Sequence, residues 1–363
     1  MKILQIGSSL ESWGGIERYI AYLSEGLEQR GHDVTVACAP SSPLALHVSA
    51  KTIPIRVRRK FDFQAFAQYL KCFRHNRFDA VHVHFSPDFL LPAMAARITR
   101  QPASIMTRHV VLPWTSTKVQ LYCTLFDHFI PVSDAVERVL ISSGVPKSRM
   151  TVAKAGCPPL QPKVDRSALR AQLGVSQDGV AFGFFGRLVV EKGIDTLIEA
   201  SQALPANASY EVFGSGPLSD ELQQRAKASG GRVHFHGFRD DVPECIQAMD
   251  AVVIPSVWEE AFPYAALEAM SVGRPVIASR AGGMPEIVSN GETGFLFDKG
   301  DSQELARIVA RLSADPALLT AMGAKGQKEH RCQYTVECMA ERIEGVYKSL
   351  KVPSPQKRHQ PAL

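Results

Sequence analysis

Several features that would assign this 363-residue chain to a narrow class are missing. No stretch approaches the roughly 20 apolar residues that a membrane-spanning helix needs. The apolar run near the N-terminus, residues 3–6, is too short for a signal peptide. The seven cysteines are odd in number and contain no Cys-x-x-Cys pair. We therefore expect a cytoplasmic protein with reduced cysteines that serve mainly in packing.

Charge is distributed unevenly along the chain. Residues 1–163 carry 20 Lys and Arg against 11 Asp and Glu, a net charge of +9, and the remaining residues carry 21 against 25, a net charge of −4. The first half therefore faces an anionic partner, or it has a basic solvated surface. No nucleic-acid-binding motif is present, so phosphate, lipid and acidic acceptors rank above DNA and RNA as partners.

Short β-rich runs alternate with helical stretches, which is typical of parallel sheets covered by helices. The run of Pro158, Pro159 and Pro162 interrupts this alternation and predicts an interdomain hinge. We predict domains at residues 1–157 and 158–335, a helix at 336–350 that crosses back to the first domain, and a disordered tail at 351–363. The predicted strands are 2–6, 34–37, 53–57, 80–84, 103–107, 129–132 and 151–154, then 181–185, 210–213, 233–236, 251–254 and 276–278.

Two cations follow the first strand of the second half. Arg187 and Lys192 lie in the segment Gly-Arg-Leu-Val-Val-Glu-Lys-Gly and are expected at the opening of the next helix. Cations beside free helical N–H groups can clamp a diphosphate. A solvated loop with two surface cations explains the same residues equally well.

Two carboxylates near a helix start give the strongest signal. A helix is predicted to begin at Pro263, with Glu260 in the loop before it and Glu268 inside it. The N–H groups of Tyr264 and Ala265 would face a diphosphate between a sugar and a ribose. Two solvent-facing glutamates are the alternative, but the apolar flanks of Glu268 argue against it.

The ordered series of these motifs resembles glycosyltransferase family 4, and the resemblance spans about residues 2–350. It implies an α/β GT-B fold, with two Rossmann-like parallel-sheet domains facing a central cleft, and retaining sugar transfer. In that family Arg187 and Lys192 would bind the donor diphosphate, Glu268 the ribose and Glu260 the transferred sugar, while Gly282, Gly283 and Glu286 would shape the pocket. The resemblance also assigns donor contacts to Gly15, Gly214, Gly216, Phe238, Ala261, Phe262, Pro263 and Tyr264.

The first half matches the family in three places. Gly14, Glu17 and Arg18 belong to a segment similar to its glycine-rich acceptor-side loop. His84 ends a histidine-bearing strand and is expected on the acceptor side, although for His82 and His84 a structural role outweighs catalysis. His109 follows the next strand, where the family keeps a histidine beside the transferring sugar, and we predict it to be catalytic together with Arg187, Lys192 and Glu260.

Two departures qualify this resemblance. Many relatives have Gly where this chain has Pro263, and proline supplies no N–H to a phosphate. There is no Asp-x-Asp motif of the metal-dependent kind, so we expect no metal and no other cofactor.

The sequence therefore predicts a retaining hexosyltransferase that moves a sugar from a UDP- or GDP-sugar to a glycan or lipid-linked acceptor, in bacterial surface polysaccharide or glycolipid synthesis. A nucleotide-sugar epimerase or a sugar phosphorylase of the same fold is an alternative, as is a catalytically inactive scaffold subunit.

Residues 51–77 suggest a membrane partner. They carry eight Lys and Arg against Asp62 alone, a net charge of +7. Phe63, Phe66, Leu70 and Phe73 fall at helical spacing. Such a segment can attach peripherally to an anionic inner leaflet. Alternatively, the apolar side chains pack against the sheet.

Overall fold

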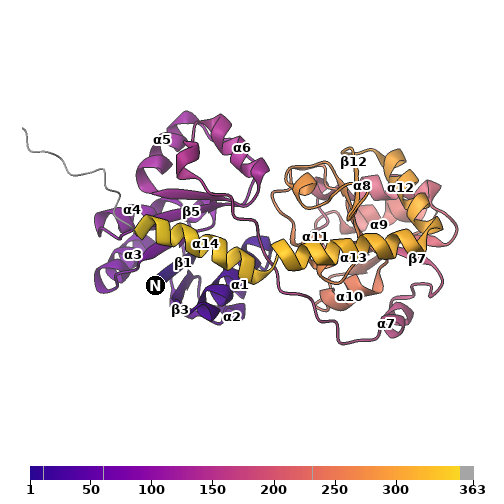
Figure 1. Ribbon diagram of the computed structural model, residues 1–363, viewed down its shortest axis with the longest axis horizontal. Coiled ribbons are helices and arrows are strands. Elements are labelled where there is room, and N and C mark those ends of the chain that lie inside the picture. The colour runs from indigo at the N-terminus through magenta and orange to yellow at the C-terminus, as the bar shows by residue number, and fades with distance from the viewer. Residues whose placement is uncertain (11, 60, 231, 352–363) are drawn as a thin grey trace, which may run out of the picture. The chain divides into compact units, whose positions relative to one another are not determined.

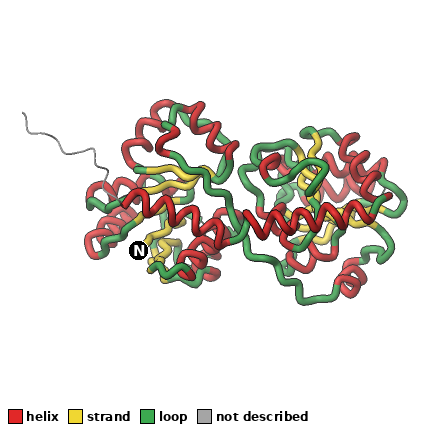
Figure 2. The backbone as a smooth tube through the Cα atoms, in the orientation of Figure 1, coloured by secondary structure: helices red, strands yellow, loops and turns green. Residues whose placement is uncertain are grey.

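The computed structural model describes residues 1–10, 12–59, 61–230 and 232–351 (Figure 1). The chain forms two compact units. The first contains Met1–Val132, Glu137–Lys154 and the chain from Val336 on, and the second contains Ser133–Val136 and Ala155–Thr335. Apart from Lys351, the tail predicted to be disordered lies outside the described residues. Figure 2 shows the strands of each unit among its helices.

The first unit has a six-stranded parallel sheet in the order β3-β2-β1-β4-β5-β6. Ile3 of β1 pairs with Val34 of β2 on one side and Ala80 of β4 on the other, so the loops after β1 and β4 diverge at this point. Such a divergence leaves a crevice where doubly wound sheets bind ligands. The strands are β1 (Lys2–Gly7), β2 (Asp33–Cys38), β3 (Lys51–Pro54), β4 (Ala80–Val83), β5 (Ser104–Arg108) and β6 (His128–Pro131).

The helices of this unit are α1 (Gly15–Gln29), α2 (Pro43–His47), α3 (Phe63–His75), α4 (Leu90–Ile98), α5 (Ser116–Leu125), α6 (Asp134–Ser143) and α14 (Val336–Lys351), with short 3-10 turns η1 (Ser86–Asp88) and η2 (Lys147–Arg149). Helix α6 begins in the part of the chain that groups with the second unit. The C-terminal helix α14 packs against α1. Glu344 of α14 fixes this packing through Arg30 at 2.6 Å and His32 at 2.9 Å.

Two strand predictions in this unit were wrong in extent or kind. The strand expected at 53–57 is β3, Lys51–Pro54, because only these residues pair continuously with β2. Residues 151–154 form no strand. They make two backbone bonds to the end of β6, from Thr151 N to Phe129 O at 3.2 Å and from Ala153 N to Pro131 O at 3.0 Å, and these do not continue as a ladder.

The apolar stripe predicted at Phe63, Phe66, Leu70 and Phe73 was right only in part, since Phe73 is buried and Phe66 and Leu70 are half-buried. Helix α3 buries Ala65, Tyr69 and Phe73, which are spaced by four residues and face the unit's interior. Phe63 is 80% exposed. The helix therefore buries Ala65 and Tyr69 together with Phe73 of the predicted stripe, and it leaves Phe63 in water.

The second unit has a parallel sheet in the order β12-β11-β10-β7-β8-β9. The strands are β7 (Val180–Phe185), β8 (Ala208–Phe213), β9 (Val233–Gly237), β10 (Ala251–Ile254), β11 (Val276–Ser279) and β12 (Gly294–Phe297). Strand β12 was not predicted. It pairs with β11 from Val276 opposite Gly294 to Ser279 opposite Phe297. The two sheets confirm the α/β fold of two parallel-sheet units.

Helices cover both faces of this second sheet. Phe182 and Tyr210 belong to a core that also contains Leu197 and Leu305, whereas Ala181 packs on the opposite face with a smaller cluster that contains Cys245. The helices are α7 (Arg166–Leu173), α8 (Ile194–Ala200), α9 (Ser219–Ala228), α10 (Val242–Ala248), α11 (Tyr264–Ser271), α12 (Ser302–Ala314) and α13 (Pro316–Gln333), with 3-10 turns η3 (Val190–Lys192), η4 (Ser201–Ala203) and η5 (Met284–Glu286).

Candidate active site

The loops after β7 and β10 bring two oppositely charged predicted site residues together. Strands β7 and β10 are neighbours at the point where the strand order reverses, so the loops that follow them flank the unit's crevice. Lys192 closes η3 after β7, and Glu260 lies in the loop after β10. The Lys192 Nζ lies 2.6 Å from Glu260 Oε1, with side chains 27% and 13% exposed. The two residues, 68 positions apart in sequence, form a half-buried ion pair.

Ser256 also holds the Glu260 carboxylate, and sequence reasoning missed it. Its Oγ donates to Glu260 Oε1 at 2.6 Å, and Ser256 is fully buried. Ser279 in turn donates to the Ser256 carbonyl at 2.6 Å. A serine directly after a predicted strand and four residues before a loop glutamate is the sequence signal that could have identified it. The carboxylate is thus oriented by two donors before any ligand binds.

Glycines let the site loops touch backbone to backbone. Gly214 has φ +135°, and a Cβ there would overlap the carbonyl oxygen of Gly186. A Cβ on Gly216 would likewise overlap the Leu188 carbonyl oxygen. These two predicted donor-binding glycines therefore support the loop after β7, which carries Arg187 and Lys192. Whether they also touch a ligand stays a prediction.

The glycines after β11 have the same role toward the Glu260 loop. Gly282 has φ +55°, and a Cβ on it would overlap the Glu260 carbonyl oxygen. A Cβ on Gly283 would overlap the carbonyl oxygen of Ala261, which is another predicted donor contact. Glu286 follows in η5, where its carboxylate accepts hydrogen bonds from the N–H groups of Asp134 and Ala135, residues that group with this unit.

Arg187 is exposed in the loop after β7. The helix start predicted directly after this loop was wrong in detail, because Gly193 with φ +65° separates η3 from α8. Lys192 therefore ends a 3-10 turn. Arg187 and Lys192 nevertheless both lie between the carboxyl end of β7 and the start of α8.

Helix α11 begins one residue later than predicted. Pro263 is its N-cap, with extended ψ of 129°, and Tyr264 is the first helical residue. The Pro263 carbonyl accepts from Ala266 N at 3.2 Å. The N–H groups of Tyr264 and Ala265 precede the first intrahelical bond at this helix end. Glu268 is 5% exposed within the helix, which excludes a solvent-facing glutamate.

Two other predicted donor contacts differ in their surroundings. Phe262 is buried, and its ring lies 5.7 Å from that of Tyr334. Phe238 follows β9, two strands away from β7, and is 70% exposed. Phe262 therefore lies in the same loop as Glu260. Phe238 is exposed to water and takes no part in the contact between Lys192 and Glu260.

Glu259 stands beside Glu260 but has separate partners. Lys299 Nζ lies 2.5 Å from its Oε1, and the Gly282 N–H donates to its Oε2 at 2.5 Å. The hydrogen bond from Lys299 is the main cause that lowers the pKa of Glu259 below its ordinary value. This residue is therefore a matched comparison for Glu260, since it is the same residue type in the same loop.

In the first unit, His82 belongs to a buried polar network. Its Nδ1 lies 2.6 Å from the Tyr347 hydroxyl and its Nε2 lies 2.6 Å from Thr107 Oγ1. His84 Nε2 lies 2.5 Å from Gln5 Oε1, and Gln5 donates to Tyr347 at 3.1 Å. Burial lowers the pKa of both histidines well below the ordinary value, so they are neutral near pH 7. These contacts favour the structural role for His82. Sequence reasoning missed Tyr347, for which local sequence gives no signal.

His109 follows β5 and packs against this network. Its ring centroid lies 4.7 Å from that of Tyr19 and 5.9 Å from that of His84. Burial, with the neighbouring Arg108 charge second, lowers the His109 pKa to about 3. Its Nε2 is buried without a hydrogen-bond partner among the described residues. A neutral imidazole with an unused nitrogen is suited to hydrogen-bond a ligand.

The loop after β1 is held by a capping interaction. The Gly14 N–H donates to Glu17 Oε2 at 3.0 Å, and Ser12 donates to Glu17 Oε1 at 3.4 Å. Glu17 is buried, so its carboxylate serves the helix start. Gly15 is exposed at the first position of α1 and Arg18 is half-buried in its first turn. The predicted acceptor-side residues thus share one helix N-terminus in the first unit.

The residues described by the structure contain no group of three or more His, Cys, Asp or Glu arranged to hold a metal ion. Within the same residues, no helix combines the length and apolar character needed to cross a bilayer.

Comparison with known proteins agrees with this architecture. The family model described as Glycosyl transferases group 1 matches residues 165–329, and that described as Glycosyltransferase Family 4 matches residues 13–158. A UDP-Gal:alpha-D-GlcNAc-diphosphoundecaprenol alpha-1,3-galactosyltransferase of Escherichia coli is 26% identical over 334 residues, covering 84% of this chain and 86% of the relative. The putative glycosyltransferase EpsD of Bacillus subtilis is 28% identical, covering 83% and 85%.

Solved structures show the same fold. The crystal structure of Anabaena HepE in complex with UDP-glucose superposes with a TM-score of 0.84 at 25% identity, covering 96% of this chain and 100% of that one. Two doubly wound parallel-sheet units with ligand loops at the carboxyl ends of their strands define a GT-B glycosyltransferase. The two family models together match most of the chain, which belongs to glycosyltransferase family 4.

Proposed function

We propose that this glycosyltransferase moves a sugar, with retention of anomeric configuration, from a nucleotide-diphosphate donor to a glycan or lipid-linked acceptor of a bacterial surface polysaccharide or glycolipid. The observation that carries the proposal is the Lys192–Glu260 pair at the crevice of the second unit. A UDP-sugar is the first candidate donor, because the Escherichia coli relative is named for UDP-Gal and HepE was solved with UDP-glucose.

Each predicted donor residue has a task in this proposal. Arg187 and Lys192 neutralise the diphosphate, assisted by the N–H groups of Tyr264 and Ala265. Glu268 accepts hydrogen bonds from the ribose and Glu260 from the transferred sugar. The bond between the sugar carbon and the diphosphate oxygen breaks, the acceptor oxygen bonds to that carbon, and the acceptor proton passes to the departing phosphate. Positive groups aimed at the developing charge are often the largest catalytic contribution.

The ion pair supports an order of events at this site. Lys192 Nζ lies 2.6 Å from Glu260 Oε1. A donor diphosphate would compete for Lys192 and leave Glu260, still held by Ser256, free to accept from sugar hydroxyls. Donor binding would thus replace the contact between Lys192 and Glu260 with two others, one from Lys192 to the diphosphate and one from Glu260 to the sugar.

We also propose that the chain's own cations take the place of a metal ion. Activity that persists after chelation with EDTA would agree, and activity restored only by a divalent cation would contradict it.

Removing the cations tests the donor site. Arg187→Ala and Lys192→Ala should each lower turnover of a UDP-sugar by about 10²-fold or more. The control is Lys325→Ala, since Lys325 is exposed in α13 and pairs only weakly with Glu292 at 3.9 Å. NMR of the product reports the anomeric configuration, and acceptor-free and phosphate-dependent assays identify an epimerase or a phosphorylase. Wild-type turnover in both cation variants would sink the assignment.

We further propose peripheral attachment to the cytoplasmic leaflet through the basic first unit. The support is the net charge of +7 on residues 51–77 together with exposed Phe63. Sedimentation with phosphatidylglycerol vesicles should decrease as salt rises, because surface charge attraction is screened. Equal sedimentation with purely phosphatidylcholine vesicles would contradict the proposal.

A further inference from the structure

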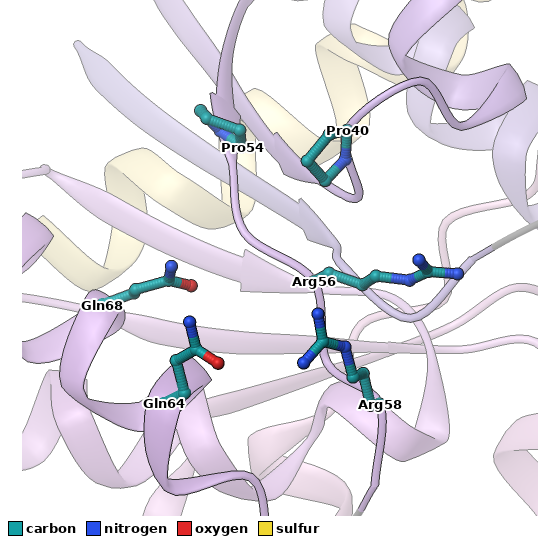
Figure 3. A pocket seen from close by; sticks show the side chains of 6 residues that line it. All are labelled: Pro40, Pro54, Arg56, Arg58, Gln64 and Gln68. Atoms are coloured by element: carbon teal, nitrogen blue, oxygen red, sulfur yellow. The ribbon is translucent and has the colours of Figure 1, made fainter.

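Two groups of arginines lie outside the donor site. In the first unit, Arg56 and Arg58 line part of a hollow of about 210 Å³ (Figure 3). They belong to the basic segment 51–77, for which membrane attachment is proposed above. The second unit contains a different group, Arg166, Arg170 and Arg274, which neither the donor site nor the membrane attachment requires.

The three arginines of the second unit surround one acid. Arg166 and Arg170 lie on α7, Arg274 lies between α11 and β11, and Asp250 directly precedes β10. Asp250 Oδ1 lies 2.6 Å from Arg166 Nη2. Its Oδ2 lies 3.1 Å from Arg170 Nη1 and accepts a hydrogen bond from Ala181 N at 2.8 Å. Both carboxylate oxygens are therefore occupied, and three arginines against one aspartate leave a net charge of +2.

Arg274 is the arginine that Asp250 does not serve. Its Nη2 donates to the Gln247 carbonyl at 2.8 Å, and the same oxygen accepts from Arg166 Nε at 3.3 Å. The guanidinium groups of Arg166 and Arg274 therefore lie side by side. Within the described part of the chain, Arg274 forms no ion pair with a carboxylate, and its buried Nε has no hydrogen-bond partner. The acid of α10, Glu244, accepts instead from Lys163 N at 3.3 Å.

This arrangement is electrostatically unfavourable without an anion. Burial, with the Arg166 charge second, lowers the Arg274 pKa to about 10, so that Arg274 is still charged near pH 7. Charges taken out of water are costly unless an opposite charge accompanies them. A solute can reach the cluster from water, because the Arg166 side chain is 34% exposed and Arg274 is half-buried. Arg170, at 1% exposure, lies inside.

The cluster lies at the edge of the sheet opposite the donor site. Ala181 is near the start of β7, and Asp250 and Arg274 precede β10 and β11, which are neighbouring strands. Lys192 and Glu260 follow the carboxyl ends of β7 and β10. The four residues of β10 span about 13 Å at the usual rise of a strand. A small ligand at the cluster therefore leaves the Lys192–Glu260 pair unoccupied.

The chemistry of the cluster favours a phosphate group. Guanidinium groups bind phosphate oxygens through pairs of N–H donors. A phosphate group carries about two negative charges near neutral pH, which would balance the net charge of the cluster. We propose that Arg166 and Arg274 form a binding site for inorganic phosphate or a phosphate ester at the amino edge of the second sheet, with Asp250 holding Arg166 in place. The inference is independent of the proposed function.

Thermal unfolding of the full-length protein in sodium phosphate, compared with sodium chloride of equal ionic strength, tests the site. The rise in Tm with concentration gives the affinity, and Arg274→Gln should weaken it about tenfold or more. In chloride alone, Arg274→Gln should be at least as stable as the wild type, because the substitution removes a charge that repels Arg166. Comparison of the two proteins in the same salt removes the general stabilising effect of phosphate.

Two further variants and a second ligand complete the experiment. The matched control is Arg225→Gln, since Arg225 belongs to the same unit but already pairs with Asp195 at 2.6 Å. It should change phosphate affinity by about twofold at most. Lys192→Ala should retain the phosphate effect, because Lys192 belongs to the donor site. Glucose 1-phosphate is titrated in parallel, and the tighter of the two ligands identifies a free phosphate or an ester as the natural occupant.

Four outcomes would overturn the inference. Equal weakening by Arg274→Gln and Arg225→Gln would show a diffuse charge effect. Loss of the phosphate effect in Lys192→Ala but not in Arg274→Gln would place the phosphate at the donor site. An equal loss of stability of Arg274→Gln in chloride and in phosphate would give Arg274 a purely structural role. Finally, neither ligand would stabilise the wild-type protein more than chloride if the site did not exist.

Discussion

The Lys192–Glu260 pair makes an unusual prediction for Glu260→Gln: nucleotide binding should improve while transfer fails. Gln keeps the shape of Glu260 and can still accept from Ser256, which donates at 2.6 Å. Its neutral amide holds the Lys192 ammonium, which lies 2.6 Å from Glu260 Oε1, less strongly than the carboxylate does. Lys192 is then free to meet a diphosphate without first leaving a carboxylate.

The size of the effect follows from the geometry and exposure of the pair. A hydrogen bond to a charged group contributes about 1.5–3 kcal/mol. Because the two side chains are 27% and 13% exposed, water screens part of this. We take about 1 kcal/mol as the net cost of separating them, which corresponds to about fivefold tighter UDP binding. Turnover should nevertheless fall about 10²-fold, since the sugar loses a charged acceptor in the transition state.

Calorimetric titration with UDP, followed by a transfer assay, measures both effects. Glu259→Gln is the matched control, because Glu259 pairs with Lys299 at 2.5 Å and should affect neither quantity strongly. Glu268→Gln should weaken UDP binding, since its proposed partner is the ribose. If Glu260→Gln weakens UDP as much as Glu268→Gln does, the roles of the two glutamates are wrong.

Two further predictions concern stability. Burial lowers the His109 pKa from 6.5 to about 3, so the unfolded chain takes up a proton first as the pH falls. Stability should therefore drop between about pH 6.5 and 3, by up to about 1.4 kcal/mol per pH unit for this residue. Urea unfolding at pH 7 and 5 should show a shallower slope for His109→Gln and a wild-type slope for exposed His75→Gln; equal slopes would refute a buried neutral imidazole. Gly214→Ala should weaken UDP binding, because the added Cβ would overlap the Gly186 carbonyl oxygen. The control is Gly237→Ala, since Gly237 also has positive φ but no atom lies within 4 Å of its added Cβ. This variant should lower the free energy of unfolding by only about 1–2 kcal/mol and leave UDP binding intact. Similar UDP affinity in both variants would contradict the loop-packing role of Gly214.

Local patterns carried enough information for the fold and for most of the site. Alternating strand and helix periods reflect which faces each element buries, and these patterns predicted eleven of the strands in outline. Arg187, Lys192, Glu260 and Glu268 stand out because charged residues directly after buried strands, or within apolar helices, need a partner. These features depend on residues close together in sequence, so they are readable without coordinates. The missed strand β12 and the one-residue shift at Pro263 show the limit of these local patterns.

Only the tertiary structure decided which groups meet. Lys192 contacts Glu260 because β7 and β10 are neighbours in the sheet, a consequence of strand order that no local pattern contains. Tyr347 reaches His82 across 265 positions because α14 returns to the first unit. In α3 the buried residues include Ala65 and Tyr69, which the predicted stripe did not contain, because packing within the first unit decides which side is covered. Asp62, the one acid of residues 51–77, accepts hydrogen bonds from the N–H groups of Arg58 and Ala65, which its place in the sequence did not reveal. Sequence specifies the residue types and their periods, whereas pairing between distant residues depends on how the sheets assemble.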